Sequence, residues 1–312
     1  MAEAPFKIAV VGGAGGVGSS LAFNLLIGDG APEVVLVDPR SEMVESHVLD
    51  LEQVLEQGVP GSVRRGGLEE VADADVVVMA AGVPLSLNTS RMVYLEDNAR
   101  LVEPTLGQLG PDFAGVLILV TNPVDPLCTW ALSRSGLDRR RMIGYTMNDT
   151  LRLRSGIAKA LAIQPGRVEA WVIGEHGDGS VPLFDRVSVD GAPAELSPTQ
   201  RASAERFLRG WYVRHVALES GRSSTWTSGF GVARMVSALR AQNDEVWTAS
   251  VMLEGEYGVR GVSLGVPVSL GPAGVERIHE WRLEPEQRAA FQAAAALVRG
   301  AADALPAGAA TL

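Results

Sequence analysis

A glycine-rich loop follows the first apolar run of the chain, residues 8–11, and precedes an amphipathic stretch. The loop consists of Gly12, Gly13, Ala14, Gly15, Gly16, Val17 and Gly18. Glycines at this spacing allow a tight turn and let the backbone approach a pyrophosphate, while a helix that starts here offers free N–H groups and a positive dipole end. The loop therefore predicts a dinucleotide site, although an ordinary glycine-rich turn would use the same residues.

An aspartate ends the second apolar run, residues 34–37. Asp38 lies about twenty residues after the last glycine of the loop, where a carboxylate would accept hydrogen bonds from the adenosine ribose hydroxyls. Because that carboxylate would repel a 2′-phosphate, the pattern favours NAD over NADP. Arg40, two residues on, keeps NADP open, and a surface aspartate at a helix start is the plainer alternative.

Four further segments carry polar side chains that a cleft beside a nicotinamide ring would need. They are residues 80–84 with Arg91 downstream, 121–125, 148–152 and 174–178. Asp149 and Arg152 are three residues apart and share a helical face, where they could also form only a salt bridge. A guanidinium fork fits a carboxylate better than a lysine does. His176 stands among glycines after an apolar run, and imidazole can both donate and accept a proton near neutral pH.

In combination these segments resemble the lactate/malate dehydrogenase family, and the resemblance runs over nearly the whole chain. Residues 255–258, 264–268 and 274–278 are similar to the closing segments of that family. The resemblance implies an NAD-dependent oxidoreductase that moves a hydride between nicotinamide and C2 of a small L-2-hydroxy acid or 2-oxo acid. It also implies a homodimer or homotetramer.

The resemblance assigns a role to individual residues. His176 matches the acid/base histidine, Asp149 the aspartate that holds this histidine, and Arg152 the arginine that binds the substrate carboxylate. Arg91 matches the lid arginine that polarises the carbonyl group, and Asn122 the asparagine that orients cofactor and substrate. Three more residues are expected in the cofactor pocket, namely Ala81, Gly82 and Asn98.

The sequence departs from the family in the substrate loop. Six positions before the lid arginine, lactate enzymes have glutamine and malate enzymes have arginine, whereas this chain has Leu85. A second carboxylate facing leucine would be poorly solvated, so we expect a substrate with an apolar side chain. The alternative is a malate dehydrogenase with a compensating cation elsewhere, for example on the helix around Trp211, whose register the resemblance leaves open.

Two weaker departures concern other positions. Asn148 stands where the family usually has leucine. Arg154 and Arg186 fall where allosteric lactate enzymes bind a phosphorylated effector, which leaves an anion site there as a possibility.

The apolar pattern indicates the elements that would hold these residues. Strand-like runs at residues 8–11, 34–37, 76–80 and 116–120 alternate with amphipathic stretches at 17–27, 43–55 and 91–109, which predicts an α/β fold with a Rossmann doubly wound parallel sheet over residues 1–145. Residues 146–312 are expected to form an α+β substrate domain with helices at 149–162, 198–219, 227–241 and 284–304 and an extended stretch at 168–189. No linker separates the two.

Composition excludes several classes of protein. The 312 residues are 46% hydrophobic and carry a net charge of −10 without a Lys/Arg-rich block, so we expect no nucleic-acid partner. No apolar run is long enough to cross a membrane, and residues 1–7 do not have the pattern of a signal peptide, so we expect neither a membrane span nor a secretory leader. The single cysteine, Cys128, rules out a disulfide framework and a thiolate metal site, and it fits a cytoplasmic setting.

Two competing functions share parts of this pattern. A glycosidase family with this fold uses NAD with a metal, which needs a Cys/His metal pair that Cys128 and its apolar neighbours do not supply. A non-catalytic NAD(H) sensor would need only the glycine loop. His176, Asp149 and Arg152 together favour the enzyme, because a sensor has no need of a proton relay.

Overall fold

A parallel sheet forms the first half of the computed structural model, which describes residues 5–83, 94–222, 224–241 and 244–306. Its strand order is β3-β2-β1-β4-β5-β6. The strands are β1 (Lys7–Val11), β2 (Glu33–Val37), β3 (Ser62–Arg65), β4 (Val76–Met79), β5 (Val116–Leu119) and β6 (Met142–Tyr145). This order confirms the predicted doubly wound α/β fold, with two parallel strands, β3 and β6, that the sequence pattern did not indicate.

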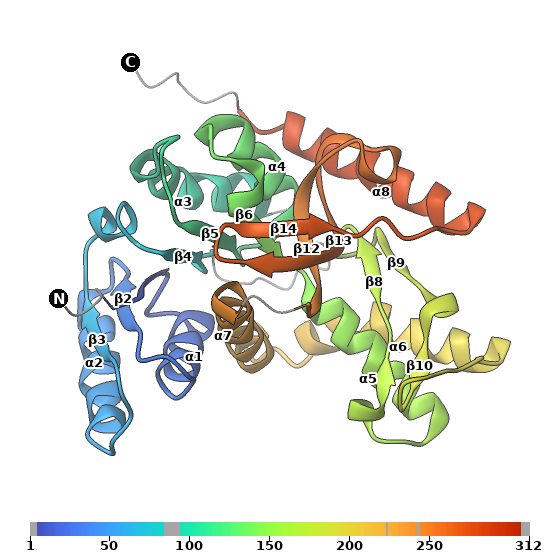
Figure 1. Cartoon of the computed structure of the whole chain (residues 1–312), viewed down its shortest axis with the longest axis horizontal. Helices are drawn as coiled ribbons and strands as arrows, with labels where there is room; N and C mark the ends of the chain where they lie inside the picture. Colours follow the sequence, from blue (N-terminus) through green and yellow to red (C-terminus); the bar gives the residue numbers. More distant parts are fainter. Residues whose placement is uncertain (1–4, 84–93, 223, 242–243, 307–312) are drawn as a thin grey trace.

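Helices cover both faces of this sheet (Figure 1). They are α1 (Gly16–Leu26), α2 (Ser41–Leu55), α3 (Leu95–Gln108) and α4 (Val124–Ser135), with a short 3-10 helix at Leu68–Val71. Alternate residues of β1 face opposite ways: Ile8 and Val10 belong to the core that contains α1 and α2, while Ala9 and Val11 belong to the core that contains α3 and α4. Burial on both faces explains why the strands read as unbroken apolar runs.

The sheet continues into the second half of the chain. Strand β12 (Val246–Glu254) pairs antiparallel with β6 through Ala249 and Tyr145, and β13, β8 and β9 extend the sheet further. The remaining strands are β7 (Val168–Glu169), β8 (Val172–Gly174), β9 (Ser180–Pro182), β10 (Ser188–Val189), β11 (Ala192–Pro193), β13 (Arg260–Gly271) and β14 (Gly274–Ile278). Strands β7, β10 and β11 form a separate small sheet.

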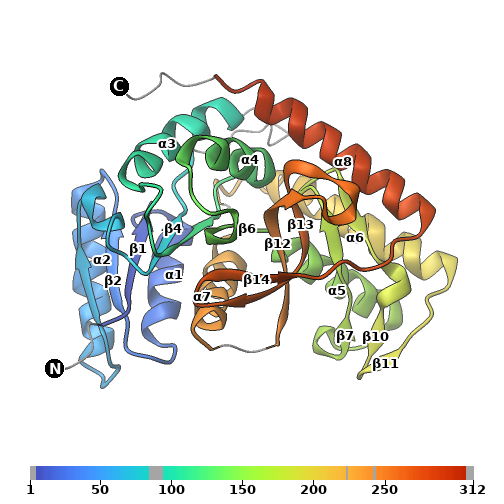
Figure 2. The same ribbon diagram turned by 45° about the horizontal axis from the view of Figure 1, so that its top comes forward.

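The helices of the second half surround this extension (Figure 2). They are α5 (Met147–Leu161), α6 (Pro198–Val216), α7 (Thr225–Ala241) and α8 (Pro285–Asp303), with 3-10 turns at Arg139–Arg141, Pro165–Arg167, Phe184–Arg186 and Glu256–Gly258. Helix α6 lies along α5, and α8 lies over α4 and β13. None of the helices in the described part of the chain is long and apolar enough to cross a membrane.

Helix α7 joins the two halves by lying directly against α1 (Figure 1). A Cβ on Gly229 would lie 2.3 Å from Ser20 Oγ and 2.9 Å from the Leu21 amide nitrogen, so this contact needs glycine. A Cβ on Gly16 would lie 2.9 Å from Thr225 Oγ1. This close crossing brings the start of α7 beside the glycine loop at the carboxyl edge of the parallel strands.

Cys128 is the only cysteine of the chain and lies in α4. It is 1% exposed, and a Cβ on Gly144 of β6 would lie 2.9 Å from its Sγ. The thiol is therefore enclosed between α4 and the sheet.

Candidate active site

The glycine loop connects β1 to α1 around a tight turn. Gly12 has a φ of +89°, and a Cβ there would lie 2.4 Å from the backbone nitrogen of Ala81. A Cβ on Gly18 would lie 2.3 Å from the carbonyl oxygen of Gly12. In the described part of the chain no side chain caps α1, which starts at Gly16, so the amides of its first turn face a position where a phosphate could bind. These residues fit the pyrophosphate of a dinucleotide.

Asp38 lies beside this loop at the end of β2, with a side chain that is 4% exposed. It accepts hydrogen bonds from the Ala14 amide at 3.2 Å and from Arg40, whose Nε lies 2.9 Å from Oδ1. Burial acts to raise the pKa of the Asp38 carboxyl, but the hydrogen bonds and charge of Arg40 outweigh it and keep the pKa below the ordinary value. Asp38 is therefore an ionised acceptor.

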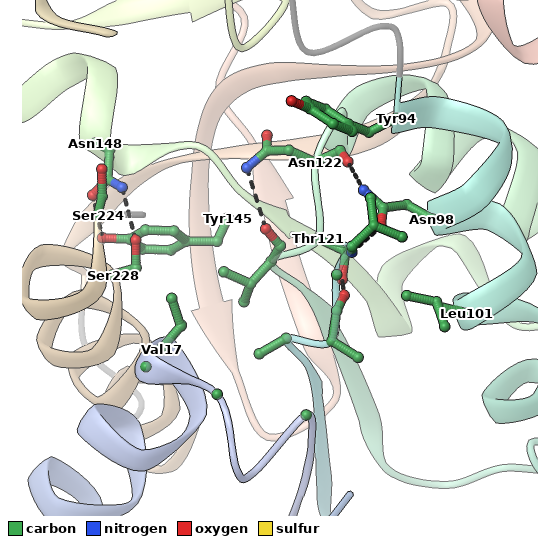
Figure 3. A pocket seen from close by; sticks show the side chains of 18 of the residues that line it. Val17, Tyr94, Asn98, Leu101, Thr121, Asn122, Tyr145, Asn148, Ser224 and Ser228 are labelled. Carbon is green, nitrogen blue, oxygen red and sulfur yellow. Dashed lines mark hydrogen bonds between the residues drawn. The ribbon is translucent and has the colours of Figure 1, made fainter. Parts of the chain in front are cut away.

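A cavity of about 610 Å³ runs from Gly12 and Asp38 to His176 and Arg152. Val17, Ala81, Gly82, Asn98 and Asn122 also line it, so the structure brings these sequence-predicted residues together, while Gly13 and Gly18 support the loop from behind. Figure 3 shows the part of its wall formed by the strand ends, the start of α1 and the start of α7.

Two asparagines and a threonine join the ends of β4 and β5 (Figure 3). Asn98 Nδ2 donates to the carbonyl oxygen of Asn122 at 2.6 Å, and Asn98 Oδ1 accepts from the Val83 amide at 2.8 Å. Thr121 Oγ1 donates to the carbonyl oxygen of Ala81 at 2.6 Å. Asn122 Nδ2 donates to the carbonyl oxygen of Val120 at 3.5 Å, and its Oδ1 is buried with no hydrogen-bond partner among the described residues.

Asp149 holds His176 and Arg152 at the other end of the cavity. His176 Nδ1 lies 2.6 Å from Asp149 Oδ2, and Arg152 Nη1 donates to Asp149 Oδ1 at 2.8 Å. All three side chains are at most 9% exposed. Because a carboxylate only accepts, Nδ1 carries the proton of this hydrogen bond, and Nε2 is the imidazole nitrogen that Asp149 does not bind.

A second buried carboxyl group holds the backbone of His176. Asp125 is 1% exposed, and its Oδ2 accepts from the His176 amide at 2.6 Å. Burial, assisted by the charge of Glu175, raises the pKa of Asp125 to about 8. Asp125 is therefore protonated at neutral pH and positions the histidine loop without adding a negative charge. Its segment was singled out in the sequence, but its contact with a residue 51 positions away was not.

Helix α6, whose register the sequence left open, places three of its residues at or beside the cavity. Arg152 Cζ lies 4.0 Å from the ring centroid of Trp211, and Trp211 stacks on His215 at 4.9 Å. Tyr212 and His215 line the cavity, whereas Trp211 supports Arg152 from the side. Ser224, just before α7, accepts from Arg152 Nη2 at 3.2 Å.

A polar cluster of Tyr145, Asn148 and Ser228 completes the wall (Figure 3). Tyr145 Oη donates to Asn148 Oδ1 at 3.2 Å, and Asn148 Nδ2 donates to Ser228 Oγ at 3.0 Å. The sequence pointed to Asn148 only as a departure from the family. Nothing local in the sequence indicated that Ser224, Ser228, Tyr212 and His215 would meet it in one cavity.

Of the other residues named from the sequence, Arg154 and Arg186 lie outside the cavity lining. Leu85 and Arg91 are outside the described residues. Arg154 lies over Trp171 at 5.1 Å and Arg186 over Trp281 at 4.7 Å, with the two tryptophan rings edge to face between them.

Comparisons with known proteins agree with this geometry. Family models match residues 6–144 as a lactate/malate dehydrogenase NAD binding domain and residues 146–304 as the alpha/beta C-terminal domain of the same family. The L-lactate dehydrogenase of Thermus aquaticus is 34% identical over 313 residues, covering 96% of this chain and 99% of that protein. The malate dehydrogenase of Halobacterium salinarum is 33% identical over 288 residues, covering 90% of this chain and 93% of that protein.

A solved structure has the same fold throughout. The malate dehydrogenase of Cryptosporidium parvum superposes with a TM-score of 0.90 at 26% identity, covering 97% of this chain and 99% of that chain. With the glycine loop, the two buried carboxyl groups and the matched halves in agreement, the chain belongs to the lactate/malate dehydrogenase family and is an NAD-dependent 2-hydroxy acid dehydrogenase.

Proposed function

We propose that this enzyme interconverts L-2-hydroxy acids and 2-oxo acids that have one carboxylate and an apolar side chain. The observation that carries the proposal is the hydrogen-bonded set of His176, Asp149 and Arg152 in the same cavity as the glycine loop. We also assign the cofactor half to residues 1–145 and the substrate half to residues 146–312.

The proton is handled by His176. Its Nε2 donates to the C2 oxygen during reduction and accepts the hydroxyl proton during oxidation. Asp149 keeps the proton of the neutral imidazole on Nδ1 and balances the charge of the imidazolium form. Asp125 holds the histidine backbone in place from the opposite side.

The substrate carboxylate binds to Arg152. Its guanidinium group is held by Asp149, Ser224 and the Trp211 ring, so the fork is oriented before the substrate arrives. Asn122 orients the reacting groups with its buried carboxamide, and Arg91 of the lid polarises the carbonyl group and helps to exclude water.

The cofactor lies along the glycine loop. The backbone from Gly12 to Gly18 receives the pyrophosphate, Asp38 receives the adenosine ribose, and the segments around Ala81, Gly82 and Asn98 form the opposite wall. When bound, NADH supplies the hydride and NAD accepts it.

The apolar preference depends on Leu85. Among the described residues that line the cavity, the arginines are Arg152, which binds the first carboxylate, and Arg40, which lies at the ribose end. The resemblance puts Leu85 where a second substrate carboxylate would bind, and leucine offers that carboxylate no charge. The competing function is malate dehydrogenation, and His215 is the observation that favours it, because its imidazole lines the substrate end.

Initial rates of NADH oxidation with pyruvate, 2-oxobutyrate, 2-oxoisocaproate and oxaloacetate test the proposal. We expect the apolar 2-oxo acids to have the higher kcat/KM. Leu85→Arg should raise the kcat/KM for oxaloacetate relative to the apolar acids by about ten- to a hundredfold, because the guanidinium group pairs with the second carboxylate. Leu85→Gln, which adds polarity without charge, is the control. A wild type that prefers oxaloacetate would overturn the apolar preference and direct attention to His215.

The enzyme is proposed to work as a homo-oligomer in the cytoplasm. Trp226 and Phe230 of α7 are 69% and 57% exposed and flank a second cavity of about 720 Å³, which is the kind of apolar face that two copies bury between them. A single buried cysteine suits a reducing compartment. Light scattering after gel filtration measures the assembly directly.

A further inference from the structure

All acceptor positions of the Asp38 carboxylate are in use. Oδ1 accepts from the Arg40 amide at 3.1 Å and from Arg40 Nε at 2.9 Å. Oδ2 accepts from the Ala14 amide at 3.2 Å and from Arg40 Nη2 at 3.0 Å. A carboxylate has about four lone-pair positions, so these four hydrogen bonds saturate it.

The Arg40 side chain therefore occupies the positions that a ribose would need. In the proposed function, on which this step rests, the adenosine hydroxyls donate to Asp38. They can do so only after the guanidinium fork has left both carboxylate oxygens, so binding of the cofactor must open the ion pair.

Arg40 is the partner that can leave this pair, because it is on the solvent side. Its side chain is 60% exposed, whereas that of Asp38 is 4% exposed. The freed guanidinium remains hydrated, and the ribose hydroxyls replace it as donors to the buried Asp38 carboxylate. The arginine also stays at the cofactor site: it lines the cavity, and its Nη2 lies 3.9 Å from the position of a Cβ on Gly15.

We propose that Arg40, once released from Asp38, binds the 2′-phosphate of NADP(H), so that the enzyme uses NADP(H) as a second cofactor beside NAD(H). A 2′-phosphate is attached to the ribose that Asp38 would hold, within reach of the side chain just displaced. The guanidinium group exchanges one anionic partner for another, and the phosphate offers it a bidentate contact. Asp38 remains nearby and repels the phosphate, so NADH stays the preferred cofactor.

Calorimetric titration with adenosine 2′,5′-bisphosphate and with 5′-AMP tests this site without substrate or redox chemistry. Wild type should bind both nucleotides. Arg40→Ala should weaken the binding of the bisphosphate by about ten- to a hundredfold, while 5′-AMP binds at least as tightly as before because its ribose no longer competes with the arginine. Asp38→Asn should strengthen the binding of the bisphosphate relative to 5′-AMP.

The matched control is Arg167→Ala, which removes another arginine that forms a two-oxygen contact with an aspartate, Asp190, outside the cavity residues. It should leave both affinities unchanged. Steady-state kcat/KM values for NADPH and NADH should follow the same order as the fragment affinities.

Three results would overturn the proposal. The wild type could fail to bind the bisphosphate, Arg40→Ala could lose affinity for both nucleotides equally, or Arg40→Ala could keep its full affinity for the bisphosphate. Failure of the proposed function would be seen in a different measurement. The enzyme would then oxidise NADH with none of the 2-oxo acids, while the affinities for the two nucleotide fragments would be unaffected.

Discussion

The cavity contains two aspartate–arginine pairs, one at each end, and they differ in burial. In the pair Asp149–Arg152 both side chains are 9% exposed, and the carboxylate also holds His176. In the pair Asp38–Arg40 the aspartate is 4% exposed and the arginine 60%. The buried pair is fixed in one arrangement before a ligand arrives, whereas the half-exposed pair can exchange partners when a ligand arrives. The fixed pair suits chemistry, and the exchangeable pair suits cofactor selection.

The largest effect is expected at His176, which is bound to Asp149 of the fixed pair. His176→Gln should lower kcat by about a hundredfold to ten-thousandfold, because the general acid is lost. The affinity for NADH, measured by fluorescence titration, should stay nearly unchanged, since the imidazole acts on the substrate oxygen. A variant that retains most of its kcat would contradict the role of His176, and a parallel loss of NADH affinity would show that the two ends are not independent.

The next effect is on stability, because replacing the two aspartates should lower the free energy of unfolding by different amounts. Asp149→Ala leaves the buried Arg152 without its carboxylate and should cost about 3–5 kcal/mol of unfolding free energy. Asp38→Ala leaves an arginine that is already mostly in water and should cost at most about 1 kcal/mol. Urea denaturation followed by circular dichroism measures both. If both variants lose the same free energy of unfolding, burial does not determine how much each pair contributes to stability.

A pH-dependent effect concerns Asp125, which holds the backbone of His176. Burial, with the charge of Glu175, raises its pKa from 3.8 to about 8, so the folded chain keeps a proton that the unfolded chain releases. The associated stability is fully present below the ordinary aspartate pKa and is lost as the pH rises through the folded pKa. The urea midpoint of wild type should therefore fall relative to that of Asp125→Asn between about pH 5 and pH 8.

Asp125→Asn keeps an acceptor oxygen for the His176 amide. The exposed Asp112 gives the control variant Asp112→Asn, which should follow wild type at every pH. Parallel curves for wild type and Asp125→Asn would contradict a protonated Asp125.

The cofactor end could be predicted from the sequence because its signals are local. Gly12 to Gly18 are consecutive, and Asp38 follows at the end of the next buried run, so strand, turn and helix positions alone bring them together. The strands that were not predicted have a physical reason. Edge strand β3 is polar and pairs on one side only, and β6 is four residues long with a glycine inside it.

The substrate end depends on long-range packing that no local pattern encodes. The resemblance pointed to His176, Asp149 and Arg152, and the structure brings them within hydrogen-bond distance. The register of α6 could not be predicted from the sequence, because it depends on Trp211 packing against Arg152, which lies 59 positions earlier in the chain. The pairing of β12 with β6, which joins the two halves in one sheet, is equally non-local.

Because Cys128 is enclosed, the rate at which its thiol is labelled reports local opening of the enzyme. Burial raises the pKa of its thiol well above the usual value, and only a thiolate attacks a thiol reagent readily. Modification therefore has to wait until α4 separates from β12 and β13, against which it packs. With no other cysteine in the chain, the labelling rate measures how often this part of the molecule opens, and it should slow when a nucleotide stabilises the closed form.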